Sequence, residues 1–103
     1  MSDDGTLGGY LRIHQRPPAF GGSDGAAYTV STLVDDDPDP QGLYGAALLF
    51  VRWSDAGEKA VGHLETDYLA FGKSADEAMA PLLAFSLAQV KAHLDACVAR
   101  RST

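Results

Sequence analysis

The segment from Leu43 to Trp53 constrains the fold most, because it is apolar at both odd and even positions. Successive side chains on a strand point to opposite faces of the sheet, so this segment places an apolar row on each face. A strand of this kind lies in the middle of a sheet and requires cover on both sides. One row holds Leu43, Ala47, Leu49, Val51 and Trp53, and the other holds Tyr44, Ala46, Leu48 and Phe50.

The segments around this central strand predict further strands. Residues 26–34 alternate between apolar and small or polar side chains, which is typical of a half-buried strand. Residues 54–58 indicate a hairpin turn that leads into a partner strand over 59–71. Polar and apolar residues would share one face of that partner strand, so we expect a bulge or break near residues 66–67. Residues 10–14 also alternate and predict a short strand.

The last third of the chain predicts two helices. Ser74 and Glu77 form a capping box, which places the first helix start at Ala75. Pro81 lacks a backbone donor and is expected to break that helix. Ser86 and Gln89 predict a second start, followed by an apolar stripe with helical spacing. The stripe consists of Leu87, Val90, Leu94, Cys97 and Val98.

Together these elements predict a small α+β domain. A mainly antiparallel sheet of three to four strands is followed by two C-terminal helices packed on one face. With 103 residues the chain has room for one domain, which we assign to residues 10–101. Residues 1–9, rich in glycine and aspartate, are expected to form a flexible N-terminus.

The charge of the chain limits its partners. The net charge is −6, and four carboxylates crowd one loop, at Asp35, Asp36, Asp37 and Asp39. Nucleic-acid binding rests on basic side chains that neutralise phosphates, so no nucleic-acid partner is expected, whereas a basic protein partner is compatible. No apolar run reaches the roughly 20 residues that span a bilayer, and the first residues do not resemble a signal peptide. We expect a cytoplasmic protein without a membrane partner.

The two apolar rows indicate self-association. Two short helices can cover one face of the sheet, so the other face is a candidate subunit interface. The commonest solution is a two-fold homodimer. Aromatic residues and arginine dominate interface hot spots, and we expect the interface to include Tyr44, Leu49, Val51, Arg52 and Trp53.

Chemistry-bearing residues are sparse. His63, Glu65 and Asp67 alternate on one predicted strand and could present an imidazole and two carboxylates to a metal ion or a proton. A solvated strand face explains the same pattern. Cys97, the single cysteine, falls on the apolar stripe of the second helix and is expected to pack in the core. We assign no catalytic residue, no metal site and no cofactor.

Residues 71–78, Phe-Gly-Lys-Ser-Ala-Asp-Glu-Ala, resemble the HicB-like antitoxin domain. In that domain a three-stranded sheet leads through a Gly-x-Thr/Ser-x-x-Glu-Ala segment into a helix. The resemblance implies a small sheet-and-helix module that acts by binding, and as a whole the chain resembles a small bacterial protein. We therefore expect a non-catalytic interaction or accessory module that self-associates. The alternatives are a small metal- or ligand-binding enzyme centred on His63, Glu65 and Asp67, or an acidic antitoxin-like protein that neutralises a basic partner.

Overall fold

The structure, a computed structural model, describes residues 5–101. Its elements are α1 (Leu7–His14), β1 (Ala19–Gly21), β2 (Ala27–Val34), β3 (Tyr44–Trp53), β4 (Ala60–Glu65), β5 (Ala70–Gly72), α2 (Ala75–Leu83) and α3 (Leu87–Arg101). All strand pairings are antiparallel, in the order β1-β2-β3-β4, with β5 paired to the first part of β3. The predicted α+β class is confirmed, including an antiparallel sheet followed by two C-terminal helices. An N-terminal helix and a fifth strand are additional.

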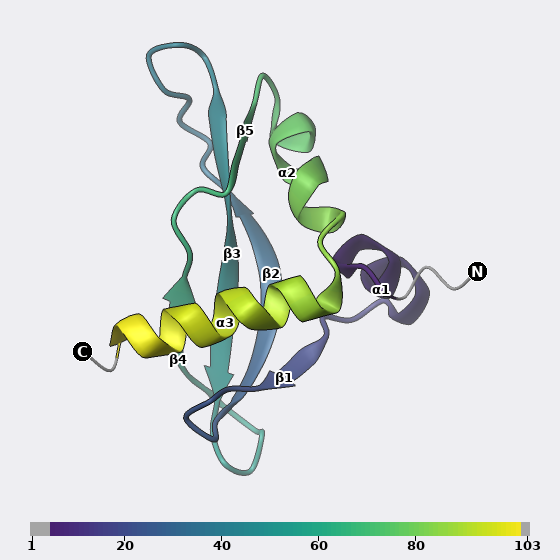
Figure 1. The fold of residues 1–103 in the computed structure, drawn as a ribbon, viewed down its shortest axis with the longest axis vertical. Helices are drawn as coiled ribbons and strands as arrows, with labels where there is room; N and C mark the ends of the chain where they lie inside the picture. The colour runs from purple at the N-terminus through teal and green to yellow at the C-terminus, as the bar shows by residue number, and fades with distance from the viewer. Residues whose placement is uncertain (1–4, 102–103) are drawn as a thin grey trace.

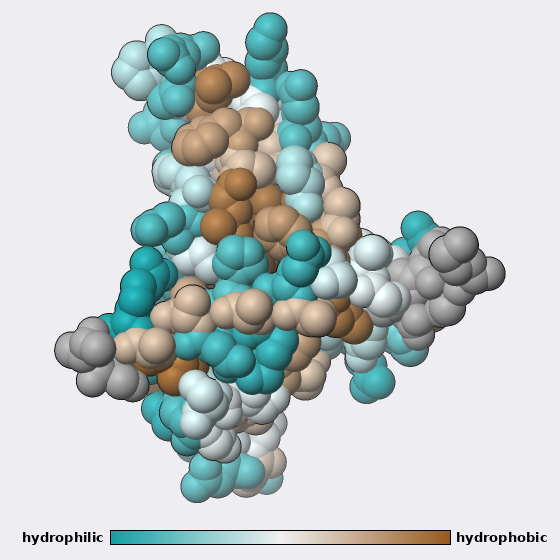
Figure 2. All heavy atoms as spheres, viewed as in Figure 1, coloured by the Kyte–Doolittle hydropathy of each residue, from teal (hydrophilic) through white to brown (hydrophobic). Residues whose placement is uncertain are grey.

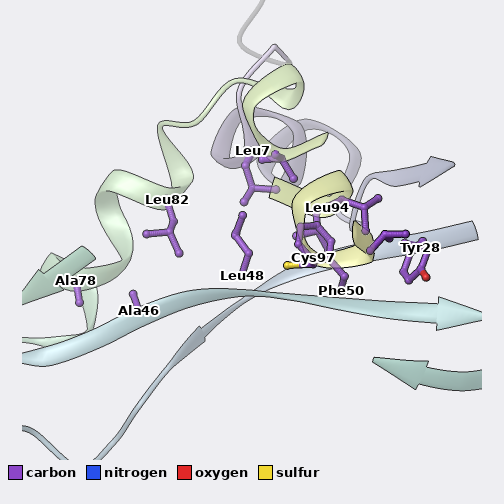
Figure 3. Close-up of a cluster of buried hydrophobic side chains, with 12 residues drawn as sticks. Leu7, Tyr28, Ala46, Leu48, Phe50, Ala78, Leu82, Leu94 and Cys97 are labelled. Carbon is purple, nitrogen blue, oxygen red and sulfur yellow. The ribbon is translucent and has the colours of Figure 1, made fainter. Parts of the chain in front are cut away.

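The molecule has two layers. Figure 1 shows α3 crossing β2, β3 and β4, and Figure 3 shows the helices on one side of the sheet. The extent of 22 Å along the shortest axis, against 42 and 39 Å along the others, fits one sheet and one layer of helices. On the helix side, Figure 2 shows hydrophilic and mildly hydrophobic residues together on the outside of α3, and a more hydrophobic area beside α2.

The core lies between the two layers. The sheet contributes Tyr28, Val30, Ala46, Leu48 and Phe50, and the helices contribute Leu7, Ala78, Leu82, Val90, Leu94, Cys97 and Val98 (Figure 3). The buried residues of α3 lie on the predicted apolar stripe. Cys97 is buried among them, which confirms its expected role in core packing.

The strand predictions around the centre of the sheet are confirmed. Every residue of β2 has a partner on β3. A hairpin follows β3, with Gly57 at a φ of 73° donating its N–H to the carbonyl of Ser54. The expected break separates β4 from β5. There Thr66 exchanges hydrogen bonds with the backbone of Leu48, through both its own N–H and its hydroxyl oxygen, so the chain stays attached to β3 without continuing the ladder.

The predicted strand over residues 10–14 is wrong, because these residues belong to α1. Thr6 caps this helix by accepting the N–H of Gly9. Of the segment 1–9 that we expected to be flexible, residues 1–4 lie outside the described residues. The remainder is part of the fold: Leu7 is fully buried and donates its N–H to the carbonyl of Phe85.

The C-terminal helices begin where their caps predict. The hydroxyl oxygen of Ser74 accepts the N–H of Glu77, while the Glu77 carboxylate reaches one residue beyond the cap and accepts the N–H of Lys73. The break predicted at Pro81 is misplaced, because α2 continues to Leu83. A proline this close to the end of a helix removes one hydrogen bond and leaves little helix beyond it to disrupt.

Candidate functional site

One face of the sheet carries an apolar surface opposite the helices. The ladder of β2, β3 and β4 places Ala47, Leu49, Val51 and Trp53 on the face opposite Ala46, Leu48 and Phe50, and Leu33 of β2 joins them as the partner of Ala47. We call these five residues, Leu33, Ala47, Leu49, Val51 and Trp53, the open face. Among residues 5–101, no helix packs on this side of the sheet (Figure 3).

The side chains of the open face are held in defined positions. The indole N–H of Trp53 donates a hydrogen bond of 2.9 Å to the hydroxyl oxygen of Thr29, so the one polar atom of the indole is satisfied within the sheet. All members except the buried Ala47 are partly buried by their neighbours. The surface is therefore preformed, which lowers the ordering cost of binding.

The predicted interface residues divide between the two faces. Leu49, Val51 and Trp53 lie on the open face. Tyr44 and Arg52 lie on the helix side, where Tyr44 packs against the core and Arg52 pairs with Tyr28 across the strands. The prediction mixed the two rows of one strand.

A hollow of about 670 Å³ adjoins the open face where β2 ends and the chain breaks between β4 and β5. Leu33, Val34 and Ala47 supply its apolar part, and Tyr68 supplies an aromatic wall. Four acidic residues are among those that line it, Asp35, Asp36, Glu65 and Asp67. This is a negatively charged rim around an apolar floor.

Tyr68 connects the two sides of the hollow. Its ring covers Gly45, where a Cβ would come within 2.7 Å of the ring atoms. Its hydroxyl donates a hydrogen bond to the Asp35 carboxylate. That bond lowers the pKa of Asp35, with a smaller contribution from the N–H of Asp37, and it raises the pKa of the Tyr68 hydroxyl.

The Tyr68 hydroxyl is expected to control the titration of Asp35. A lowered carboxyl pKa means that stabilisation is present above the ordinary value and is lost as the pH falls through the lowered value. Tyr68→Phe keeps the ring over Gly45 and removes the donor, so the pKa of Asp35 should rise toward its ordinary 3.8. Carboxyl carbon NMR during an acid titration measures this shift. Tyr10→Phe, on α1, is the control and should leave the titration of Asp35 unchanged. If the pKa of Asp35 is the same in Tyr68→Phe and in the parent chain, the Tyr68 hydroxyl does not lower it.

His63, Glu65 and Asp67 are not arranged as a metal-binding set. The His63 Nε2 and Glu65 Oε1 atoms lie 3.6 Å apart on the exposed face of β4. Asp67 follows the end of the strand, and its carboxylate pairs with Arg100 of α3 at 3.4 Å. Within residues 5–101, no group of three or more histidine, cysteine, aspartate or glutamate side chains is placed to hold a metal ion.

Sequence reasoning missed two parts of this site. Leu33 was not among the residues predicted from the sequence. The alternation of the strand does indicate it, because Leu33 is the one large apolar residue in the row that also holds Ala27, Thr29 and Ser31. The contact of Tyr68 with Asp35 was not predicted, because it joins residues 33 positions apart. No local pattern reports a contact of that kind.

Comparison of the chain with protein-family models, curated proteins and solved structures finds no match. The resemblance of residues 71–78 to the HicB-like domain therefore stays a prediction. The strand, cap and helix start that carry it are present as β5, Ser74 and α2. Among the helices of residues 5–101, none combines the length and the apolar character needed to cross a bilayer.

Proposed function

We propose that the chain is a non-catalytic interaction module that pairs with a second copy of itself through the open face. One observation carries the proposal: the central strand of the sheet has apolar side chains on both faces, and helices cover one of them. Apolar surface exposed to water favours association by roughly 25 cal/mol per Å² removed from solvent. A second copy supplies the layer that this sheet lacks.

The chemistry of the open face favours a second copy as the occupant. In a two-fold contact the same surface meets itself, so a charged centre would repel its own image. The five members of the open face are uncharged, and their neighbours on β2 are the neutral Thr29 and Ser31. On β4 their cross-strand neighbours are His63 and Glu65, whose side chains lie 3.6 Å from each other. Asp35, after the end of β2, and Glu65, opposite Leu49 on β4, border the open face, so the pairing we propose has to leave their carboxylates at its rim. Two sheets packed face to face form a common protein architecture.

A basic protein partner is the second candidate for the same surface. The acidic residues that line the hollow favour it, because three of them, Asp35, Asp36 and Glu65, lie beside its apolar floor without an arginine or lysine partner among the described residues. Such a partner would supply lysine or arginine side chains with apolar stems. It corresponds to the antitoxin-like alternative, and it predicts a chain that is monomeric when purified alone.

The open-face dimer predicts a mass of twice 10.9 kDa in solution at micromolar concentration. Val51→Asp places a carboxylate at the centre of both copies, opposite His63 of the same chain. Removing these two like charges from water in one contact should weaken the dimer by at least about tenfold. Sedimentation equilibrium or light scattering measures both results. Ile13→Asp is the matched control, because Ile13 is exposed on α1, outside the open face.

Two outcomes would overturn this proposal. One is a parent chain that is monomeric across the micromolar range, and the other is a dimer that Val51→Asp leaves intact. Far-ultraviolet circular dichroism of Val51→Asp verifies that the monomer is folded, which we expect because Val51 is only partly buried in the single chain.

A further inference from the structure

Arg52 is a charged residue on the helix side of the sheet. It lies in one row across three strands, between Tyr28 on β2 and Gly62 on β4. Its Nε atom is buried and has no hydrogen-bond acceptor among the described residues. Buried polar groups are almost always hydrogen-bonded, so this guanidinium stands out in the fold.

A second guanidinium approaches the same place. Arg101, in the last turn of α3, brings its Nη1 atom to 4.0 Å from the position that a Cβ on Gly62 would occupy. Apart from the chain neighbours of Gly62, no other heavy atom of residues 5–101 comes within that distance. The two arginines thus flank a place on the sheet that Gly62 leaves without a side chain.

The electrostatics of Tyr28 agree with this placement. Burial raises the pKa of the Tyr28 hydroxyl, and so does its hydrogen bond to Asp24. The charges of Arg52 and Arg101 act in the opposite direction. Both guanidiniums are therefore within electrostatic reach of the same ring.

The neighbouring negative charge does not balance this pair. Asp24 accepts the N–H of Ala26 with one oxygen and the hydroxyl of Tyr28 with the other. Within residues 5–101, neither Arg52 nor Arg101 forms an ion pair or a side-chain hydrogen bond. Among the described residues, Asp24 is the one carboxylate that acts on the Tyr28 hydroxyl, against the two guanidiniums of Arg52 and Arg101.

We propose that Arg52 and Arg101 bind an oxyanion of the phosphate type beside Gly62. A guanidinium presents its N–H groups as a planar fork that matches phosphate oxygens. One fork is sufficient for a planar carboxylate, whereas two forks from different elements suit a tetrahedral group with oxygens in several directions. A dianion also neutralises both arginines. This site is on the helix side of the sheet and does not depend on the open-face dimer.

Titration calorimetry with inorganic phosphate, at constant ionic strength set with chloride, tests the site. We expect saturable binding of one phosphate per chain and competition by sulfate, which has the same shape and charge. Arg101→Ala removes one of the two guanidinium groups from an exposed position and should weaken phosphate binding about tenfold or more. Gly62→Val removes no charge but fills the space beside Arg52, so it should also weaken binding. Circular dichroism verifies the fold of each variant.

Lys73→Ala is the matched control. It also removes one positive charge, but Lys73 adjoins the end of β5, which pairs with the opposite end of β3 from Arg52. Its phosphate affinity should equal that of the parent chain. Absence of saturable phosphate binding, or equal affinity in Arg101→Ala and Lys73→Ala, would overturn the site. Acetate that competes as well as sulfate would overturn the assignment to a phosphate-type anion.

Discussion

Phe50→Ala should lower the free energy of unfolding by about 3–5 kcal/mol. Phe50 is fully buried at the centre of β3, and its ring lies between the sheet and the helices (Figure 3). Removing the ring loses its transfer free energy and leaves a cavity that the two layers cannot fill without moving. Folded domains of this size are stable by about 5–15 kcal/mol in total, so the change removes a large part of the stability. Urea unfolding followed by circular dichroism measures the loss.

Leu49→Ala is the matched control on the same strand. Leu49 is next to Phe50 but lies on the open face, where it is only partly buried in the single chain. At concentrations that keep the chain monomeric, its truncation should cost about 1 kcal/mol or less. If the chain dimerises as proposed, the cost of Leu49→Ala grows with protein concentration while that of Phe50→Ala remains large throughout. Equal losses in the dilute monomer would contradict the two-layer assignment.

The contrast between these neighbours shows how far a sequence pattern can predict this fold. The apolar run over 43–53 identifies the central strand because both of its rows are apolar. For the same reason it does not reveal which row the helices cover. That choice depends on where α2 and α3 dock, which is a tertiary property. Tyr44 and Arg52 were therefore grouped with Leu49 although they face the opposite way.

Local signals predicted the C-terminal helices better than the N-terminal one. Ser74 and Ser86 each cap a helix by accepting the backbone N–H of the residue three positions later. The first N–H groups of any helix lack a partner within the helix, so such a cap can be recognised from the local sequence. In α1 the glycines at positions 8 and 9 weaken the helical pattern. Gly8 is nevertheless favoured there, because a Cβ would come within 3.1 Å of the Leu83 backbone oxygen. The helix is stabilised by this close contact with α2 and by the burial of Leu7, neither of which the local pattern reveals.

The candidate site was predictable in part. The residues that β3 contributes were predictable, since the alternation of side chains along a strand assigns Leu49, Val51 and Trp53 to one face. The hollow was not predictable, because its walls come from the end of β2, the loop that follows it and the break between β4 and β5. Tyr68 and Asp35 meet there only once the sheet has formed.

Gly72→Ala should destabilise the fold by about 1–3 kcal/mol, whereas Gly21→Ala should be nearly neutral. Both glycines end a three-residue strand with the sequence Ala-Phe-Gly, and neither has a positive φ. A Cβ on Gly72 would come within 2.5 Å of the backbone nitrogen of Ala78, in the first turns of α2. A Cβ on Gly21 would meet no atom of the other described residues within 4 Å.

The tertiary contact alone therefore separates the two variants, because their local sequence is the same. Backbone atoms of a helix cannot rotate away as the end of a flexible side chain can, so accommodating the methyl group at position 72 requires α2 to shift away from β5. That shift would disturb Ala78 and Leu82, which are fully buried against the sheet. Urea unfolding of the two variants under identical conditions measures the difference, and equal midpoints would show that α2 does not pack on β5 in this way.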